Sequence, residues 1–212
     1  MVDILAHRGY WIDPSEKNTL VAFKRALDND FGIETDFRDR EGRLFVAHDV
    51  NDKNIMLAED FFSLPKISMV PLALNIKADG LQTLLKESLS RYNITNYFLF
   101  DASIPDLLVA VAKELNSYSR LSEYEGFSAV DEKTSGFWLD QFHGLWFTEA
   151  YIRTILSSNK KICIVSSELH KRDHIPLWNT LKKIYRDIPK NLAQNMQVCT
   201  DYPLEFRGFL NE

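Results

Sequence analysis

The chain has 212 residues, of which 45% are hydrophobic and 26% are charged, and these are ordinary proportions for a globular protein. They exclude disorder, collagen and coiled coil as the main architecture, and the length fits a single domain over residues 1–212. The formal net charge of −5 argues against general nucleic-acid binding, because that affinity comes from basic side chains that neutralise phosphates.

We expect no membrane span, because the longest aliphatic run, at 107–112, is far shorter than the roughly 20 residues that a spanning helix needs. The first residues predict a strand rather than a signal peptide. The two cysteines, Cys163 and Cys199, define no disulfide framework, and we expect both to be buried thiols. These features favour a soluble, cytoplasmic protein, and they leave its oligomeric state open.

Short apolar runs alternate along the chain with segments of helical periodicity. Asn18 or Thr19 is placed to cap the first helix, at 20–27. Further helices are predicted at 80–92, 104–115, 149–158 and 175–187. Strands are predicted at 4–6, 32–37, 44–47, 69–76, 97–100, 118–121, 144–147, 162–165 and 196–200.

This alternation implies a parallel sheet with right-handed crossovers. About eight such strands fit the α/β class, as a compact (β/α)8 TIM barrel, and an open doubly wound sheet is the alternative. A barrel predicts that reactive side chains gather at the carboxyl ends of the strands.

Polar residues of the types used in catalysis lie near those strand ends. His7 and Arg8 follow the first strand, and Glu34 and Asp36 lie two apart in the second, so both carboxylates point to the same face. Two buried carboxylates repel each other, and a hard divalent cation with oxygen ligands would remove that repulsion.

Further candidates come from the next strands. His48 follows the run at 44–47, while Asn75 and Lys77 end the run at 69–76. Two histidines can divide general acid and general base catalysis, and Arg8 and Lys77 suit phosphate oxygens. Taken together, a cation, two histidines and two basic side chains indicate phosphodiester cleavage.

Six segments carry a family resemblance. They are Ala6-His7-Arg8-Gly9, Asn18-Thr19-Leu20-Val21-Ala22-Phe23, Ile33-Glu34-Thr35-Asp36, Val46-Ala47-His48-Asp49, Leu74-Asn75-Ile76-Lys77 and Thr200-Asp201-Tyr202-Pro203. The first four resemble, in order and spacing, the glycerophosphodiester phosphodiesterase family, and the last two resemble later motifs of that family. Its members are (β/α)8 barrels that use one divalent cation, usually magnesium or calcium.

The resemblance implies a phosphoric diester hydrolase that acts on a small phosphodiester substrate of lipid metabolism. It also implies an acid–base pair, three cation ligands and two residues that bind phosphate. The acid–base pair would be His7 and His48. The cation ligands would be Glu34, Asp36 and Asn75, and the residues that bind phosphate would be Arg8 and Lys77.

The chain departs from the family pattern at four places. Asn75 stands where the family has Glu, so the cation is expected to bind weakly, since an amide oxygen brings no charge. The Pro-Glu of the family is Glu16-Lys17 here, the insertion after the second histidine is short (50–68), and 166–168 replace a Trp-Thr. A short insertion predicts an open mouth that admits a bulkier head group.

The sequence leaves open two alternative functions and one alternative role for Asp101. Venom-type phospholipases D, which are related, also pair two histidines with a short insertion, so a lipid diester cleaved to a cyclic phosphate is a second candidate reaction. The change at Asn75 also suits a barrel that binds a phosphate ester without turnover. Asp101 is predicted to cap the helix that follows it, with a third carboxylate ligand as the alternative, and Trp11 to line the mouth.

Overall fold

The computed structural model describes residues 2–51 and 55–212. The chain divides into two compact units. One, the N-terminal unit, comprises Ala6–Ser117, and the other, the C-terminal unit, comprises the stretch before Ala6 together with Tyr118–Glu212. The boundary falls within strand β1 (Asp3–His7).

The N-terminal unit is built on a parallel set of strands. β2 (Gly32–Arg40) pairs in parallel with β5 (Leu72–Ile76), which pairs in parallel with β6 (Tyr97–Phe100). β3 (Arg43–Val46) and β4 (Met56–Leu57) extend the other edge of β2 in antiparallel fashion. The helices are α1 (Leu20–Asp28), α2 (Ala58–Phe62), α3 (Gln82–Arg91) and α4 (Ile104–Ala112), with short 3₁₀ helices at Pro14–Glu16 and Ile67–Met69.

An aromatic cluster fixes which face of β2 meets the helices. Phe37 stacks on Phe62 of α2 with ring centroids 5.5 Å apart, and Phe61 meets Phe23 of α1 at 4.8 Å. All four rings are buried. Since side chains alternate along a strand, the residues on either side of Phe37 are directed to the opposite face, away from this cluster.

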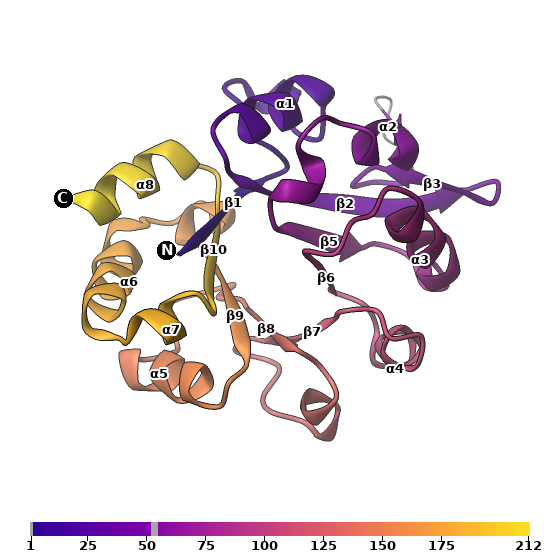
Figure 1. The fold of residues 1–212 in the computed structure, drawn as a ribbon. Helices are drawn as coiled ribbons and strands as arrows, with labels where there is room; N and C mark the ends of the chain where they lie inside the picture. The colour runs from indigo at the N-terminus through magenta and orange to yellow at the C-terminus, as the bar shows by residue number, and fades with distance from the viewer. Residues whose placement is uncertain (1, 52–54) are drawn as a thin grey trace. The chain divides into compact units, whose positions relative to one another are not determined.

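The C-terminal unit contains four consecutive parallel strands, shown in orange to yellow in Figure 1. They are β7 (Tyr118–Leu121), β8 (Gly136–Leu139), β9 (Lys161–Val165) and β10 (Met196–Thr200). The helices are α5 (Glu149–Ser157), α6 (Ile175–Asp187), α7 (Lys190–Ala193) and α8 (Pro203–Asn211), with 3₁₀ helices at Ala129–Glu132 and Ser167–His170. Cys163 and Cys199 are buried thiols, as expected, and neither forms a disulfide within the described residues.

The predicted strand at 144–147 is wrong, and β8 lies at Gly136–Leu139 instead. Both segments consist of a glycine followed by three apolar residues, so periodicity cannot tell which of them forms the strand. Tertiary packing does: a Cβ at Gly136 would lie 2.6 Å from the carbonyl oxygen of Lys161, so only glycine fits where β8 passes β9. The later segment is a loop in which Trp146 Nε1 donates to the carbonyl oxygen of Asp140.

The strand predicted at 44–47 forms, but it runs antiparallel to β2 and is not one of the parallel strands. The cause is the two-residue turn between them. Glu41 and Gly42 both have positive φ, of 52° and 75°, as a type I′ hairpin turn requires. The chain therefore reverses at once, and β2 extends to Arg40.

Several other boundaries shift. The strand predicted at 69–76 begins at Leu72 after a 3₁₀ turn, and the helix predicted at 104–115 ends at Ala112. Ser103, not Asp101, caps α4, because its hydroxyl accepts a hydrogen bond from the backbone of Asp106. The short insertion at 50–68 holds β4 and α2, although 52–54 lie outside the described residues. Within the described residues, every helix is too short or too polar to cross a membrane.

Gly9, directly after β1, provides a test of this packing. It has φ of +86°, and an added Cβ would lie 2.8 Å from the Cβ of Ala22 on α1. Gly9→Ala is expected to lower the free energy of unfolding by about 2–3 kcal/mol, measured by urea denaturation. Gly126→Ala is the control, since a Cβ there has no neighbour within 4 Å, and an equal loss in both variants would contradict the packing argument.

Candidate active site

The turn after β1 ties the first two site residues to β2. Arg8 and Gly9 both have positive φ, of 57° and 86°, which bends the chain sharply at the strand end. The backbone N–H of Arg8 lies 2.9 Å from the carbonyl oxygen of Glu34 and 3.2 Å from its Oε2. His7 Nε2 lies 3.9 Å from the same Oε2. The imidazole and the carboxylate are thus held side by side.

Asp36 is the centre of a second group of contacts. Its Oδ2 lies 3.1 Å from Arg8 Nε and accepts a hydrogen bond of 2.9 Å from Asn18 Nδ2, and its Oδ1 lies 3.3 Å from Lys77 Nζ. Burial by itself would raise the pKa of Asp36, but the two cations and the amide of Asn18 bring that pKa below its ordinary value. Asp36 is therefore ionised at neutral pH.

Asn18 was missed as a site residue by the sequence reasoning, which treated it as a helix cap. Thr19 caps α1 instead, and its hydroxyl accepts from the backbone N–H of Ala22. Asn18 has φ of +58° and bridges Asp36 and Thr35, because its Oδ1 accepts from Thr35 Oγ1 at 2.8 Å. The Asn-Thr pair in the sequence was the available signal.

Glu34 is almost completely buried, with 2% of its surface exposed. Burial, and secondarily the charge of Asp36, raise the pKa of Glu34 to about 7, against a smaller lowering by His7, Arg8 and Lys77. A buried acid that holds its proton near neutral pH is a feature of reactive sites and of sites that accept a cation.

His48 reaches this region through the β2–β3 hairpin. The backbone N–H of Ala47 donates to the carbonyl oxygen of Asp36 at 3.0 Å, which places His48 just beyond the strand pair. Asp49 Oδ1 lies 3.1 Å from His48 Nδ1. Arg38 links two site residues, because its guanidinium donates to the carbonyl oxygens of His48 (2.8 Å) and Lys77 (2.9 Å). Sequence reasoning missed Arg38, which lay beyond the predicted strand end.

Asn75 lies beside Asp36, because the two residues are register partners on the parallel strands β5 and β2. Side chains of register partners share a face, so the amide adjoins the two carboxylates. Asn75 Nδ2 donates to Asp101 Oδ2 at 3.1 Å. Asn75 is 6% exposed, and its Oδ1 has no hydrogen-bond partner among the described residues.

These oxygens fit a hard divalent cation. Asn75 Oδ1 is buried with no hydrogen-bond partner among the described residues, Asp36 Oδ1 is buried and pairs with Lys77 Nζ at 3.3 Å, and the Glu34 carboxylate shares their face. Carboxylate and amide oxygens are the ligands that Mg²⁺ and Ca²⁺ take in proteins. Within the described residues, no group of three or more His, Cys, Asp and Glu forms a metal-binding set.

Trp11 contacts the backbone of His7, and its predicted position at the mouth stays a prediction. Its Nε1 donates to the carbonyl oxygen of His7 at 3.2 Å, and Lys17 Nζ lies 4.4 Å from the ring centroid.

The change at 166–168 has a structural explanation within the C-terminal unit. Glu168 is 9% exposed, and its carboxylate accepts from the hydroxyls of Ser166 and Thr200 and from the backbone of Asp201 at 3.0 Å. All of these contacts are internal, so Glu168 anchors the end of β10 and is not available as a reactive acid.

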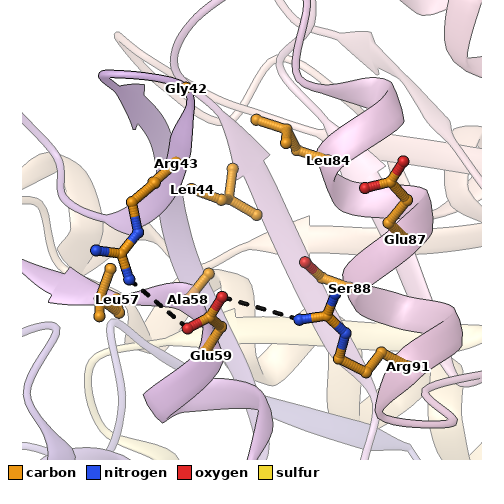
Figure 2. A pocket seen from close by; sticks show the side chains of 10 residues that line it. All are labelled: Gly42, Arg43, Leu44, Leu57, Ala58, Glu59, Leu84, Glu87, Ser88 and Arg91. Carbon is orange, nitrogen blue, oxygen red and sulfur yellow. Dashed lines mark ion pairs between the residues drawn. The ribbon is translucent and has the colours of Figure 1, made fainter.

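A separate pocket on the N-terminal unit does not qualify as the active site. It has a volume of about 120 Å³ between the β3–β4 edge and helices α2 and α3 (Figure 2). Glu59 lies between Arg43 and Arg91 at 3.8 and 3.9 Å, and all three side chains are at least half exposed. Exposed pairs of this length contribute little, and the lining holds no histidine.

Comparison with known proteins shows the fold. No family model matches the sequence, and no curated protein does. Among solved structures, the chain is similar to a Galdieria sulphuraria protein assigned to the glycerophosphodiester phosphodiesterases, with 16% identity, a TM-score of 0.75, and coverage of 100% of this chain and 98% of that one.

Two further structures agree. The glycerophosphodiester phosphodiesterase of Thermotoga maritima has 17% identity and a TM-score of 0.70, over 98% of both chains. An Oleispira antarctica phosphodiesterase, in complex with its product sn-glycerol-3-phosphate, has 16% identity and a TM-score of 0.68, over 99% of this chain and 97% of that one. The chain therefore has the fold of the glycerophosphodiester phosphodiesterases, and the predicted (β/α)8 TIM barrel is confirmed.

The raised pKa of Glu34 predicts how stability depends on pH. Between its ordinary pKa of 4.5 and about 7, the unfolded chain loses this proton while the folded protein keeps it. The free energy of unfolding should then fall as pH rises through this window, by up to about 1.4 kcal/mol per pH unit.

Glu34→Gln removes this titration. In EDTA, urea denaturation at several pH values across the window should show the variant gaining stability relative to the wild type as pH rises. Parallel pH profiles for the two proteins would contradict the assignment.

Proposed function

We propose that the chain, as one domain over residues 1–212, is a phosphoric diester hydrolase of the glycerophosphodiester type that depends on a divalent cation. One observation carries the proposal: on this fold, two histidines, two carboxylates and two basic side chains come together around β2 and its neighbours. The match to solved structures along the whole chain supports the single domain.

The cation would be held by Glu34, Asp36 and Asn75, whose buried oxygens fit it as described. When bound, it would supply Lewis-acid charge to the phosphoryl oxygens. Its identity is proposed as Mg²⁺ or Ca²⁺, since both take oxygen ligands, and weak binding is expected from a neutral third ligand.

Arg8 and Lys77 would bind the phosphate group. Both side chains lie against Asp36, at 3.1 and 3.3 Å, and each is partly accessible, with 23% and 21% of the side chain exposed. Arginine suits the oxygens of a phosphate through its forked donors, and lysine does so as a point charge.

His7 and His48 would transfer protons. The carboxyl group of Glu34 lies 3.9 Å from His7 Nε2 and would help to orient the imidazole. The carboxylate of Asp49 lies 3.1 Å from His48 Nδ1, and we therefore propose Nε2 as the atom of His48 that transfers the proton. One imidazole would deprotonate the attacking group while the other protonates the leaving alkoxide.

A pocket next to His48 offers room for the head group of the substrate. It has a volume of about 370 Å³ and combines charged and apolar walls. Its lining includes the residues that flank His48 and the residue after Lys77: Ala47, Asp49 and Ala78, with Arg38, Phe45 and Ile55 among the others. A small polar head group with some apolar surface fits this lining.

Hydrolysis of a generic aryl phosphodiester and of a glycerophosphodiester, each with added Mg²⁺ or Ca²⁺ and with EDTA, tests the function. Activity that requires the cation supports the proposal. Cation binding without turnover of any diester would instead favour the binding module. Phosphorus NMR of the products shows whether water attacks or a substrate hydroxyl forms a cyclic phosphate.

The acid–base roles predict the effect of two variants. His7→Ala and His48→Ala should each lower kcat by about 10²–10⁴-fold, because a general acid or base contributes that much. His143→Ala is the control, since this exposed histidine lies in the C-terminal unit on a loop near Tyr124. A loss of only a few-fold in a folded His7 or His48 variant would remove that residue from the mechanism.

A further inference from the structure

The hydrogen bond between Asn75 and Asp101 determines which end of the Asn75 amide faces Asp101. Asn75 is the next-to-last residue of β5, and its register partner on β6 is Phe100, so Asp101 is the next residue beyond that partner. The hydrogen bond runs from Asn75 Nδ2 to Asp101 Oδ2 at 3.1 Å. An ionised carboxylate can only accept hydrogen bonds, so it selects the NH₂ end of the amide and not the carbonyl end.

Because the NH₂ end is held by Asp101, the carbonyl end of Asn75 is directed elsewhere. Its Oδ1 is buried and finds no hydrogen-bond donor in the part of the chain that the structure describes. Asp36 Oδ1, on the register partner of Asn75, is likewise buried, and it lies 3.3 Å from Lys77 Nζ. A buried acceptor without a partner is destabilising, and an amide oxygen beside a buried carboxylate suits a positively charged ligand.

Asp101 is placed for this contact and not for helix capping. Its φ of +62° lies in the left-handed region, and Ser103 provides the cap of α4. The backbone therefore turns at Asp101 in a conformation that Asp and Asn adopt more readily than most residues. That turn directs the carboxylate back to the neighbouring strand.

We propose that Asp101 is a positioning residue that holds the Asn75 amide with its carbonyl oxygen toward the face of Glu34 and Asp36, so that a neutral side chain serves as the third oxygen ligand of a hard divalent cation. This inference rests on the cation site of the proposed function. It assigns Asp101 a role through Asn75 and not as a direct ligand.

Calorimetric titration of the full chain with Mg²⁺ and with Ca²⁺, without substrate, tests the proposal. Asp101→Gly removes the acceptor at a position whose positive φ glycine adopts freely, so the fold should survive. Cation binding should weaken by about 10–100-fold, as is typical when the residue that orients a metal ligand is lost. Asp101→Asn keeps an acceptor oxygen, and its affinity should stay closer to the wild type than to the glycine variant.

The same substitution in an Asn75→Asp protein separates the loss of amide orientation from a general disruption of the cation site. In Asn75→Asp, both ends of the side chain are oxygens, so no orienting partner is needed. Asp101→Gly in this background should leave cation affinity unchanged or tighten it, because it also removes a neighbouring like charge. Circular dichroism of each variant confirms that it is folded.

Three results with the variants would overturn the proposal, and one result with the wild type would do so too. One is unchanged affinity in Asp101→Gly, another is an equal loss in Asp101→Asn and Asp101→Gly, and the third is an equal loss in both Asn75 backgrounds. A wild type that binds neither cation would overturn it as well. A wild type that binds the cation but hydrolyses no diester would contradict the proposed function alone, and the positioning of Asn75 would still stand on the binding data.

Discussion

Two acidic side chains buried on one face of a single strand are the constraint around which the N-terminal unit is arranged. Glu34 and Asp36 cannot both be ionised in a low-dielectric interior without compensating charge. The chain compensates Asp36 with two cationic side chains and an amide, and it leaves Glu34 with a raised pKa near 7. The sharp turn after β1 and the register of β5 against β2 both serve to bring compensating groups to this face.

The same arrangement supplies the chemistry that we propose. The cationic groups that hold Asp36, Arg8 and Lys77, are partly accessible and are the natural partners of a phosphate. Arg38 helps to hold two of these residues in place, because its guanidinium donates hydrogen bonds to the backbone carbonyl oxygens of His48 and Lys77. A single buried acidic pair thus accounts for the position of the basic residues, and the hairpin next to it accounts for the position of the second imidazole.

The fold persists at 16% identity to the solved structures because it depends on pattern and not on particular residues. Buried strands that alternate with helices build the same parallel arrangement from many different apolar side chains. At two places where the chain departs from the family pattern, neighbouring side chains form hydrogen bonds with the residue that stands there. Glu168 is satisfied by hydroxyls from two strand ends, and Asn75 is held by Asp101. Thr200 and Asp101 lie 32 and 26 residues from Glu168 and Asn75, so no local motif predicts these two contacts.

The sequence by itself determined the class of fold, most of the elements and the types of side chain at the site, because periodicity and strand-end position are local properties. Helix 175–187 and strand 196–200 needed no correction. Tertiary structure alone decided that β8 lies at 136–139, since only the contact with β9 demands a glycine there. It also decided that Asn18 and Asp101 hold site residues and do not cap helices. These contacts span 18 and 26 residues, and a side-chain pairing across such distances depends on strand register, which no local pattern encodes.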